Sequence, residues 1–358
     1  MNYYYNDIYR DELEHIIKKN GGLKYLNNKS IVITGARGLI GSMLIDAIMY
    51  ANEKFGINCN IYAIVRNQEQ SVKRFNKYMR LPLLKIIKAD INHDDIDIKS
   101  DIDFFVHGAS NTHPVYYSSK PIETILTNTI GTNKVLEFSI KHKCKRFIFL
   151  SSVEIYGENR GDTESFSENY CGYIDCNTLR AGYPEGKRLG EALCQAYRKE
   201  KNLDCIILRV ARCYGAGLLK NDSKALSQFL RNVLNGEDII LKSKGNQYYS
   251  YVYVADAVDS IFFAIKNGKD GEAYNVNGKE SNITLKELAK LVAEDSNGKV
   301  TFDLPDKSEI EGFSKVTKAI LNCDKFRKVG WQGNYTIREG IKRTLKMMKE
   351  QDDRGTAV

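Results

Sequence analysis

The sequence lacks the features that would place the chain in a membrane or outside the cell. No apolar run reaches the roughly 18 residues that a membrane-spanning helix requires. The first residues are rich in Tyr, Asn and Asp, without the apolar stretch of a secretory signal. The eight cysteines form no Cys-x-x-Cys pair and no cluster with histidine, which indicates free thiols rather than a zinc site. These absences predict a cytoplasmic protein that does not associate with a membrane and holds no metal.

The net charge of +8 shows no pattern that would indicate nucleic-acid binding. It comes from lysines spread along the chain, and no stripe of aromatic and basic residues accompanies them. We interpret these lysines as solvated surface charge, with attraction of an anionic small-molecule substrate as the alternative. With 358 residues, of which 42% are hydrophobic, the chain is long enough for one large α/β unit and a smaller lobe.

Short apolar strands alternate with helical patterns from residue 30 onward. Such strands are expected at 31–34, 61–65, 84–87, 104–106, 146–150 and 205–208. Because these strands are apolar throughout, we expect a parallel sheet covered by helices on both faces, which is the doubly wound α/β fold of the Rossmann type.

The chain divides into four expected parts. Residues 1–29 form an N-terminal helical extension, 30–215 the Rossmann domain, 216–350 a smaller α/β lobe with elements that return to the main domain, and 351–358 a tail. The smaller lobe is expected to open with a helix over 217–237.

Three glycines follow the first expected strand at the spacing G-x-x-G-x-x-G. Gly35 and Gly38 allow the backbone to turn tightly and to approach a pyrophosphate, and Gly41 allows the following helix to pack close to the strand. The N-terminus of that helix adds amide donors and the positive end of its dipole. Because the turn lies between an apolar strand and an amphipathic helix, it predicts a dinucleotide site in residues 30–215 and leaves substrate binding to the smaller lobe.

The residue that ends the second strand bears on the choice between NADP and NAD. A carboxylate there would bind the ribose diol of NAD, but the sequence has Arg66. Arg66, with Arg37, suits a 2′-phosphate, so NADP is favoured over NAD; the alternative is an arginine stacked on adenine without phosphate discrimination. Asp90 is placed to accept from the adenine amino group or to cap a helix. The other residues expected at the cofactor are Leu39, Ile40, Asn67, Ile91, Gly108, Ala109 and Ser110.

A tyrosine and a lysine four residues apart supply the expected chemistry. Tyr183 and Lys187 share one helical face, and the strand at 146–150 delivers Ser152 to the carboxyl edge of the sheet, where such folds bind ligands. A neighbouring ammonium and the positive nicotinamide ring are expected to lower the pKa of the phenol. Tyr183 would then accept a hydroxyl proton from the substrate, with Ser152 bonded to the same oxygen, while hydride passes to the cofactor. A surface Tyr/Lys pair without catalytic function is the alternative.

Taken together, these residues resemble the extended short-chain dehydrogenase/reductase superfamily, and within it the nucleotide-sugar epimerases, dehydratases and decarboxylases. The likeness is greatest to UDP-glucuronate decarboxylases. It is carried by the stretches PIETILTNTIGT (121–132), SSVEIYG (151–157), RAGYPEGKRLGE (180–191) and GNQYYSYVYVAD (245–256). The resemblance implies a nucleotide-diphosphate sugar as substrate and a homodimer built from helices near 122–142 and 185–200.

The resemblance also assigns roles to single residues. It implies that Ser152, Tyr183 and Lys187 are catalytic. Asn128 would support the geometry of the active site beside the cofactor, and Glu154 would line the sugar pocket as an acid or base. The residues expected at the substrate are Ser110, Thr112, Ser152, Val153, Glu154, Arg212 and Tyr249.

Three positions depart from the pattern of this group. Val153 stands where 4,6-dehydratases carry an acid directly after the catalytic hydroxyl residue, which weakens the assignment as a standard dehydratase. Arg212 stands where an Asn touches the substrate diphosphate, and Tyr249 stands where the Gly-x-Gln-x-Arg motif has its arginine. We therefore expect the anionic group of the substrate to be bound from another side, by Arg212.

Three functions remain open from the sequence. The favoured one is oxidation of a sugar ring carbon, C4, with the cofactor retained, followed by epimerisation, decarboxylation or elimination; neither the nucleotide base nor the sugar is indicated. The alternative is an NADPH-dependent carbonyl or sugar reductase that exchanges its cofactor, a role that Arg66 favours. A non-catalytic dinucleotide sensor is disfavoured because such proteins have usually lost the tyrosine or the lysine, and Tyr183 and Lys187 are both present.

Overall fold

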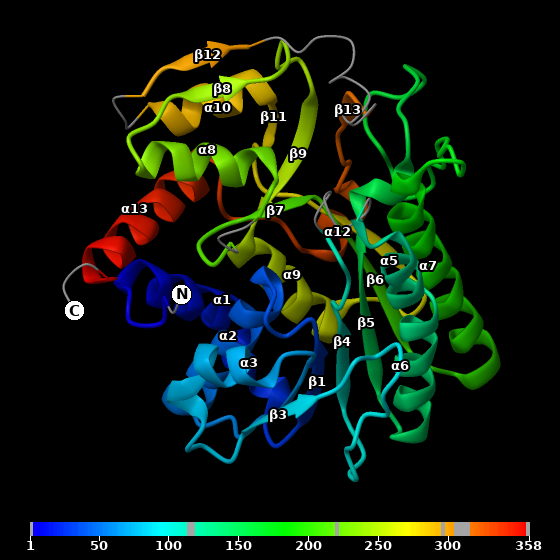
Figure 1. Cartoon of the computed structure of the whole chain (residues 1–358). Helices are drawn as coiled ribbons and strands as arrows, with labels where there is room; N and C mark the ends of the chain where they lie inside the picture. Colours follow the sequence, from blue (N-terminus) through cyan, green and yellow to red (C-terminus); the bar gives the residue numbers. More distant parts are fainter. Residues whose placement is uncertain (1–2, 113–118, 219–221, 295–297, 304–315, 356–358) are drawn as a thin grey trace.

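The fold is built on a seven-stranded parallel sheet (Figure 1). This computed structural model describes residues 3–112, 119–218, 222–294, 298–303 and 316–355. The strands follow the order β10-β6-β5-β4-β1-β2-β3. The order reverses between β1 and β4, and ligands of open α/β sheets bind at such a switch point. The strands are β1 (Ser30–Thr34), β2 (Asn60–Val65), β3 (Leu84–Lys88), β4 (Phe104–His107), β5 (Arg146–Ser152), β6 (Cys205–Val210) and β10 (Ala273–Val276).

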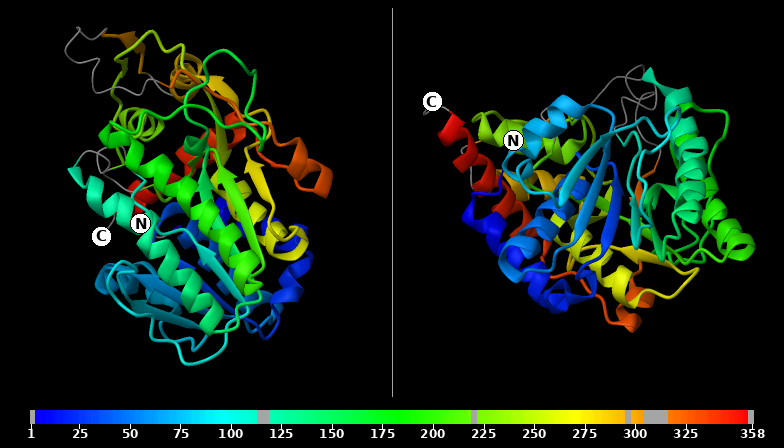
Figure 2. Two further views of the ribbon diagram at one scale, coloured as in Figure 1. Left: turned by 90° about the vertical axis from the view of Figure 1, so that its right-hand side faces the viewer. Right: turned by 90° about the horizontal axis from the view of Figure 1, so that it is seen from below.

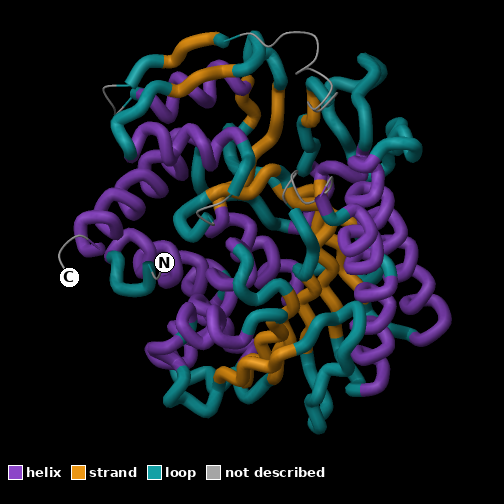
Figure 3. The backbone as a smooth tube through the Cα atoms, viewed as in Figure 1, coloured by secondary structure: helices purple, strands orange, loops and turns teal. Residues whose placement is uncertain are grey.

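Helices cover both faces of this sheet because the strands carry apolar side chains on both faces. Ile31 and Ile33 of β1 are buried in the core on the side of α2 (Leu39–Phe55) and α9 (Val254–Asn267). Val32 between them is buried on the opposite side, in a core that includes residues of α6 (Ile130–Lys141) and α7 (Gly182–Lys201). Figure 2 shows α6 and α7 running side by side along that face, and Figure 3 shows the strands enclosed between the two helical layers. The prediction of a doubly wound Rossmann sheet is confirmed.

A smaller lobe sits over the carboxyl edge of the sheet. Its central strand β9 pairs with β7, β11 and β13, and a second pair of strands, β8 and β12, lies beside it. The parallel register of β7 and β9 sets Arg212 opposite Tyr251. The elements are β7 (Arg212–Tyr214), β8 (Ile239–Leu241), β9 (Tyr248–Tyr253), β11 (Asn282–Thr284), β12 (Val300–Phe302), β13 (Lys318–Ala319), α8 (Ala225–Leu234), α10 (Leu285–Ala293), α12 (Asp324–Val329) and α13 (Ile337–Gly355).

Two helix boundaries differ from those expected. The helix expected over 217–237 begins only at Ala225. Gly215 and Gly217 have φ of +151° and +99°, which right-handed helix excludes, and 219–221 lie outside the described residues. At the other end of the chain, α13 continues to Gly355, so helix extends into the segment expected to be a tail. No helix in the described ranges combines the length and apolarity that crossing a membrane requires.

The N-terminal helix α1 (Asp7–Lys19) is integral to the fold rather than an appendage. Its buried Glu12 accepts hydrogen bonds from the hydroxyl of Tyr253 at 2.8 Å and from Arg343 of α13 at 3.3 Å. Asn20, which follows the helix, donates to Asp259 of α9 at 2.7 Å. The helix therefore links the smaller lobe, the C-terminal helix α13 and the helical layer that contains α9. It lies beside α13 in Figure 1.

Candidate active site

The glycine turn between β1 and α2 leaves no room for side chains at two positions. Gly35 has φ +68°, and a Cβ there would lie 2.5 Å from the carbonyl oxygen of Gly108. A Cβ on Gly41 would lie 2.4 Å from the carbonyl oxygen of Gly35. Gly38 is the N-cap of α2, and no side chain caps the helix there, so the amides of its first turn are available to a ligand. This cradle fits a pyrophosphate.

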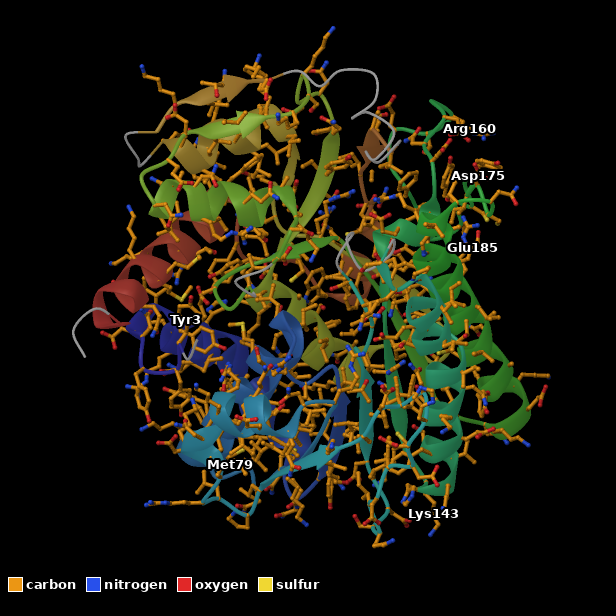
Figure 4. The ribbon with its side chains drawn as sticks, viewed as in Figure 1. Tyr3, Met79, Lys143, Arg160, Asp175 and Glu185 are labelled. Atoms are coloured by element: carbon orange, nitrogen blue, oxygen red, sulfur yellow. The ribbon has the colours of Figure 1, made fainter. Side chains whose placement is uncertain are left out.

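A cavity of about 560 Å³ opens from this turn along the carboxyl edge of the sheet. Figure 4 labels Arg160 and Asp175 on the segment between β5 and α7, on the carboxyl side of the sheet, and Lys143 on the opposite side. Most of the residues expected at the cofactor and the substrate line the cavity: Gly35, Arg37, Gly38, Leu39, Ile40, Gly41, Arg66, Asn67, Asp90, Ile91, Gly108, Ala109, Ser110, Thr112, Ser152, Val153, Glu154, Tyr183, Lys187 and Arg212.

Two of the expected site residues, Asn128 and Tyr249, do not line this cavity. Asn128, at the end of α5 (Pro121–Asn128), accepts a hydrogen bond from the hydroxyl of Ser110 at 2.9 Å. A Cβ on Gly186 of α7 would lie 2.8 Å from the Asn128 Cβ, so the two helices touch there. Asn128 therefore fixes Ser110 and the position of α7 without itself lining the cavity.

The hydroxyl of Tyr183 and the ammonium of Lys187 are both buried at the start of α7. Tyr183 is hydrogen-bonded to the side chain of Ser152, and Lys187 donates to the carbonyl oxygen of Leu150 at 2.9 Å. The Ser152 hydroxyl also accepts from the backbone N–H of Glu154 at 3.2 Å. The structure thus brings the expected Ser, Tyr and Lys to one end of the cavity, with Glu154 beside them.

Burial dominates the acid–base properties of this pair. It raises the pKa of Tyr183 to about 12, although the hydrogen bond from Ser152 acts in the opposite direction. It lowers the pKa of Lys187 to about 8, against the charge of Glu191, which raises it. The lowered phenol pKa expected from the sequence is therefore not a property of the protein alone, and the lysine ammonium is bound to a backbone carbonyl.

A buried ion pair anchors α7 to the sheet behind these groups. Glu191 accepts three hydrogen bonds from Arg209 of β6, the shortest at 2.7 Å, and one from the hydroxyl of Ser151. Arg209 is opposite Ser151 in the register of β5 and β6. Ser151 therefore has a positioning task, and its neighbour Ser152 is left to face Tyr183.

Three side chains that the resemblance treats separately are in contact at the substrate end. The guanidinium carbon of Arg212 lies 3.6 Å from the ring centroid of Tyr249. Its Nη2 lies 3.6 Å from Oε1 of Glu154. Val153, where a dehydratase acid would stand, is a buried apolar part of the same wall. The carboxylate of Glu154 and the guanidinium of Arg212 therefore lie at the same end of the cavity as the Ser152 and Tyr183 hydroxyl groups.

At the other end of the cavity, Arg66 is held by an acidic residue that the sequence did not single out. Its Nη1 is ion-paired with Glu123 of α5, and its Nη2 lies 3.4 Å from Oδ1 of Asn111. Partial burial raises the pKa of Glu123, but hydrogen bonds from Arg66 and Asn111 outweigh it and keep the pKa below the usual value. Asp90 lines the cavity and accepts from the N–H of Asn92 at 2.9 Å, so it also stabilises its own turn.

Asp222 and Lys224 also line the cavity and were missed from the sequence. Asp222 accepts from the N–H of Lys224 at 2.9 Å, just before α8 begins. Their position could have indicated a place in the site, because they follow two glycines after a strand, and loops at strand ends often carry ligand-binding residues. Lys224 brings a further cation to the site.

Comparisons with known proteins agree with this geometry. A family model described as "NAD dependent epimerase/dehydratase family" matches residues 31–277. UDP-glucuronic acid decarboxylase 1 of Xenopus tropicalis is 27% identical over 335 residues, covering 92% of this chain and 75% of that protein. UDP-glucuronic acid decarboxylase 3 of Arabidopsis thaliana is 28% identical over 316 residues, covering 88% and 87%.

Solved structures share the fold at lower identity. UDP-glucose 4-epimerase of Thermotoga maritima superposes with a TM-score of 0.75 at 23% identity, covering 90% of this chain and 99% of that one. UDP-glucuronic acid 4-epimerase of Bacillus cereus, solved with UDP-glucuronic acid and NAD, superposes with a TM-score of 0.73 at 19% identity and the same coverage. None of these four relatives is named as a reductase.

Proposed function

Because the chain belongs to the NAD-dependent epimerase/dehydratase family, we propose that it oxidises C4 of the sugar in a nucleotide-diphosphate sugar, using a dinucleotide that stays bound between turnovers. The observation that carries this proposal is a single cavity that holds the glycine turn at one end and Ser152, Tyr183 and Lys187 at the other. The relatives named above act, by their names, on UDP-sugars, which supports a substrate of the same class.

The residues of the cavity divide the work as follows. The glycine turn and the N-terminus of α2 would hold the pyrophosphate, and the bound dinucleotide would supply a hydride acceptor and a positive charge near Tyr183. The Tyr183 oxygen accepts the proton of the sugar hydroxyl, and the Ser152 hydroxyl bonds the same oxygen and orients it. Lys187, fixed by the Leu150 carbonyl, keeps a buried positive charge at the same end of the cavity as Tyr183.

The oxidised sugar can then be epimerised, decarboxylated or dehydrated, and the products distinguish these outcomes. The purified enzyme is incubated with UDP-, CDP-, GDP- and dTDP-sugars, and the products are identified by mass and by NMR couplings. Loss of carbon dioxide, loss of water, or altered couplings at constant mass each identifies one reaction. Conversion without added cofactor supports a retained dinucleotide. Absence of conversion with every sugar, or a strict need for added NADPH, contradicts the proposal and favours the reductase.

The choice between NAD and NADP depends on whether Arg66 is available. Its guanidinium is already paired with Glu123, so a 2′-phosphate would have to compete with that carboxylate. We therefore propose NAD as the preferred cofactor, although Arg66 alone favoured NADP.

Replacing Glu123 by glutamine is expected to raise the affinity for NADP relative to NAD by about tenfold, because Arg66 loses its charged partner. The measurement is titration of both cofactors into the stripped protein, followed by fluorescence. Glu137→Gln, on α6 of the same flank, is the matched control and should leave the ratio unchanged. If the wild-type protein already prefers NADP, the 2′-phosphate displaces Glu123 from Arg66, and the proposed preference for NAD is wrong.

We also propose a homodimer formed by the flank of α5, α6 and α7, where Ile122 (72% exposed), Ile130 (49%) and Leu189 (49%) present apolar side chains to solvent. A twofold interface sets such a patch against its own copy. Ile122→Glu should therefore shift the protein to monomer, because it places like charges together. Sedimentation measures the oligomeric state, with Ile240→Glu on the other lobe as the control; a wild-type monomer contradicts the proposal.

The cytoplasmic location stays a prediction.

A further inference from the structure

The guanidinium of Arg212 has partners on two sides and one nitrogen without a hydrogen-bond partner among the described residues. One face stacks on the ring of Tyr249, with 3.6 Å between the guanidinium carbon and the ring centroid. Nη2 faces Glu154 at 3.6 Å, which is an ion-pair distance but longer than a hydrogen bond. Nη1 is buried and has no hydrogen-bond partner among the described residues. Arg212, which lines the cavity, therefore has an N–H donor that is not yet hydrogen-bonded within the described part of the chain.

A buried donor without a partner carries a free-energy cost, because it has given up its bonds to water. That cost is recovered if a ligand supplies an acceptor, and a positively charged donor gains most from an anion. The distant ion pair with Glu154 satisfies the charge of Arg212 only in part. An incoming acidic group would meet a cation that is already oriented and incompletely neutralised.

We propose that Arg212 and Tyr249 form one anion-binding unit for an acidic group on the sugar, and that Glu154 is the internal counter-ion which this group replaces. The inference rests on the proposed function and specifies the part of the substrate that the unit contacts.

The position of Glu154 places the acidic group on the sugar rather than on the diphosphate. The backbone N–H of Glu154 donates to the Ser152 hydroxyl at 3.2 Å, and Ser152 is hydrogen-bonded to Tyr183, so Glu154 lies beside the Tyr183 phenol. Burial is the main cause that raises the pKa of Tyr183 and of Tyr249, and the negative charge of Glu154 raises both further. Tyr183 is the group that reacts with the sugar hydroxyl. An anion that takes the place of Glu154 at Arg212 therefore lies next to the reacting carbon.

Tyr249 acts through Arg212 as a positioning residue. Its hydroxyl donates to the carbonyl oxygen of Val316 at 2.7 Å, and its side chain is buried behind the cavity wall. This bond fixes the plane of the ring, and the ring fixes the plane of the guanidinium. Loss of the hydroxyl alone should be tolerated, because the stacking surface remains, whereas loss of the ring should release Arg212.

The test compares an acidic and a neutral ligand of the same nucleotide. UDP-glucuronate and UDP-glucose are titrated calorimetrically into cofactor-loaded protein that carries Tyr183→Phe, which keeps both ligands unreacted. Arg212→Gln is expected to weaken UDP-glucuronate by about tenfold to a hundredfold and to leave UDP-glucose nearly unchanged. Tyr249→Leu should reproduce this selective loss, and Tyr249→Phe should not. Glu154→Gln should tighten UDP-glucuronate, since the competing carboxylate is removed.

A double variant tests the claim that the two residues are one unit. Arg212→Gln combined with Tyr249→Leu should bind UDP-glucuronate no more weakly than Arg212→Gln alone, because the ring has nothing left to orient. Arg327→Gln, an exposed arginine of α12, is the matched control and should change neither affinity.

Several outcomes would overturn the inference. Equal weakening of both ligands by Arg212→Gln would assign the guanidinium to the diphosphate. Unchanged affinities would leave Arg212 a purely structural role, and a Tyr249→Leu protein with wild-type discrimination would separate the two residues. If neither ligand binds the cofactor-loaded protein with Arg212 and Tyr249 intact, and no CDP-, GDP- or dTDP-sugar binds either, the proposed function fails as well, which distinguishes that case from failure of the unit alone.

Discussion

Replacement of Tyr183 by phenylalanine is expected to lower turnover by about a hundredfold to ten-thousandfold while the cofactor and the sugar nucleotide still bind. The variant removes one oxygen from a buried side chain whose ring continues to fill its place in α7. Without that oxygen the sugar hydroxyl loses its expected proton acceptor, since Ser152 supplies only a hydrogen bond, Lys187 is engaged with the Leu150 carbonyl, and Glu154 is ion-paired with Arg212. The loss should therefore fall on kcat and leave KM within a few-fold.

The measurement combines product formation with absorbance of the reduced cofactor in single turnover. Tyr274→Phe is the matched control: its hydroxyl is also buried and accepts from the N–H of Lys269 at 3.1 Å, but it belongs to β10 and lies outside the cavity lining. That variant should lose about 1 kcal/mol of stability and no activity. A Tyr183→Phe enzyme that still reduces its cofactor at the wild-type rate would remove Tyr183 from the role of base.

The parts of this site that local sequence predicts are those that a strand and the next turn or helix position together. The glycine turn follows β1 directly, and the close approach of Gly108, just after the adjacent strand β4, leaves no room for a side chain at Gly35. Tyr183 and Lys187 share a face because four residues make about one helical turn. In both cases the spacing of residues along the chain already determines how they lie relative to each other.

Other features depend on segments that meet only in the folded chain. Glu123 pairs with Arg66 across 57 residues of sequence, and no pattern around either residue indicates it. Tyr249 and Arg212 are brought together by the pairing of β9 with β7, so their substitutions could be noted separately but not recognised as a contact. The raised pKa of Tyr183 in the protein without a dinucleotide could not be predicted for the same reason: residue spacing shows which charges are near a phenol but not how completely water is excluded from it.

Gly35→Ala is expected to remove the cofactor from the purified protein, with a loss of affinity of at least about a hundredfold. The added methyl group would lie 2.5 Å from the carbonyl oxygen of Gly108. Because the atoms that it meets belong to the backbone, no side chain can rotate away to relieve the clash. Either the turn moves away from the end of β4 or the two strands separate, and in both cases the amides of α2 leave the position in which they face a pyrophosphate. Overpacking of this kind should also cost about 1–3 kcal/mol of stability.

Gly56→Ala separates this steric effect from backbone strain. Gly56 ends α2 with φ +62°, close to the +68° of Gly35, but a Cβ there would meet nothing within 4 Å. Alanine at both positions must adopt a left-handed conformation, at a cost of about 1–2 kcal/mol. Cofactor content after purification and the midpoint of thermal unfolding should therefore fall together in Gly35→Ala, whereas Gly56→Ala should lose stability alone. Retention of a full complement of cofactor by Gly35→Ala would mean that the close approach to Gly108 does not shape the dinucleotide site.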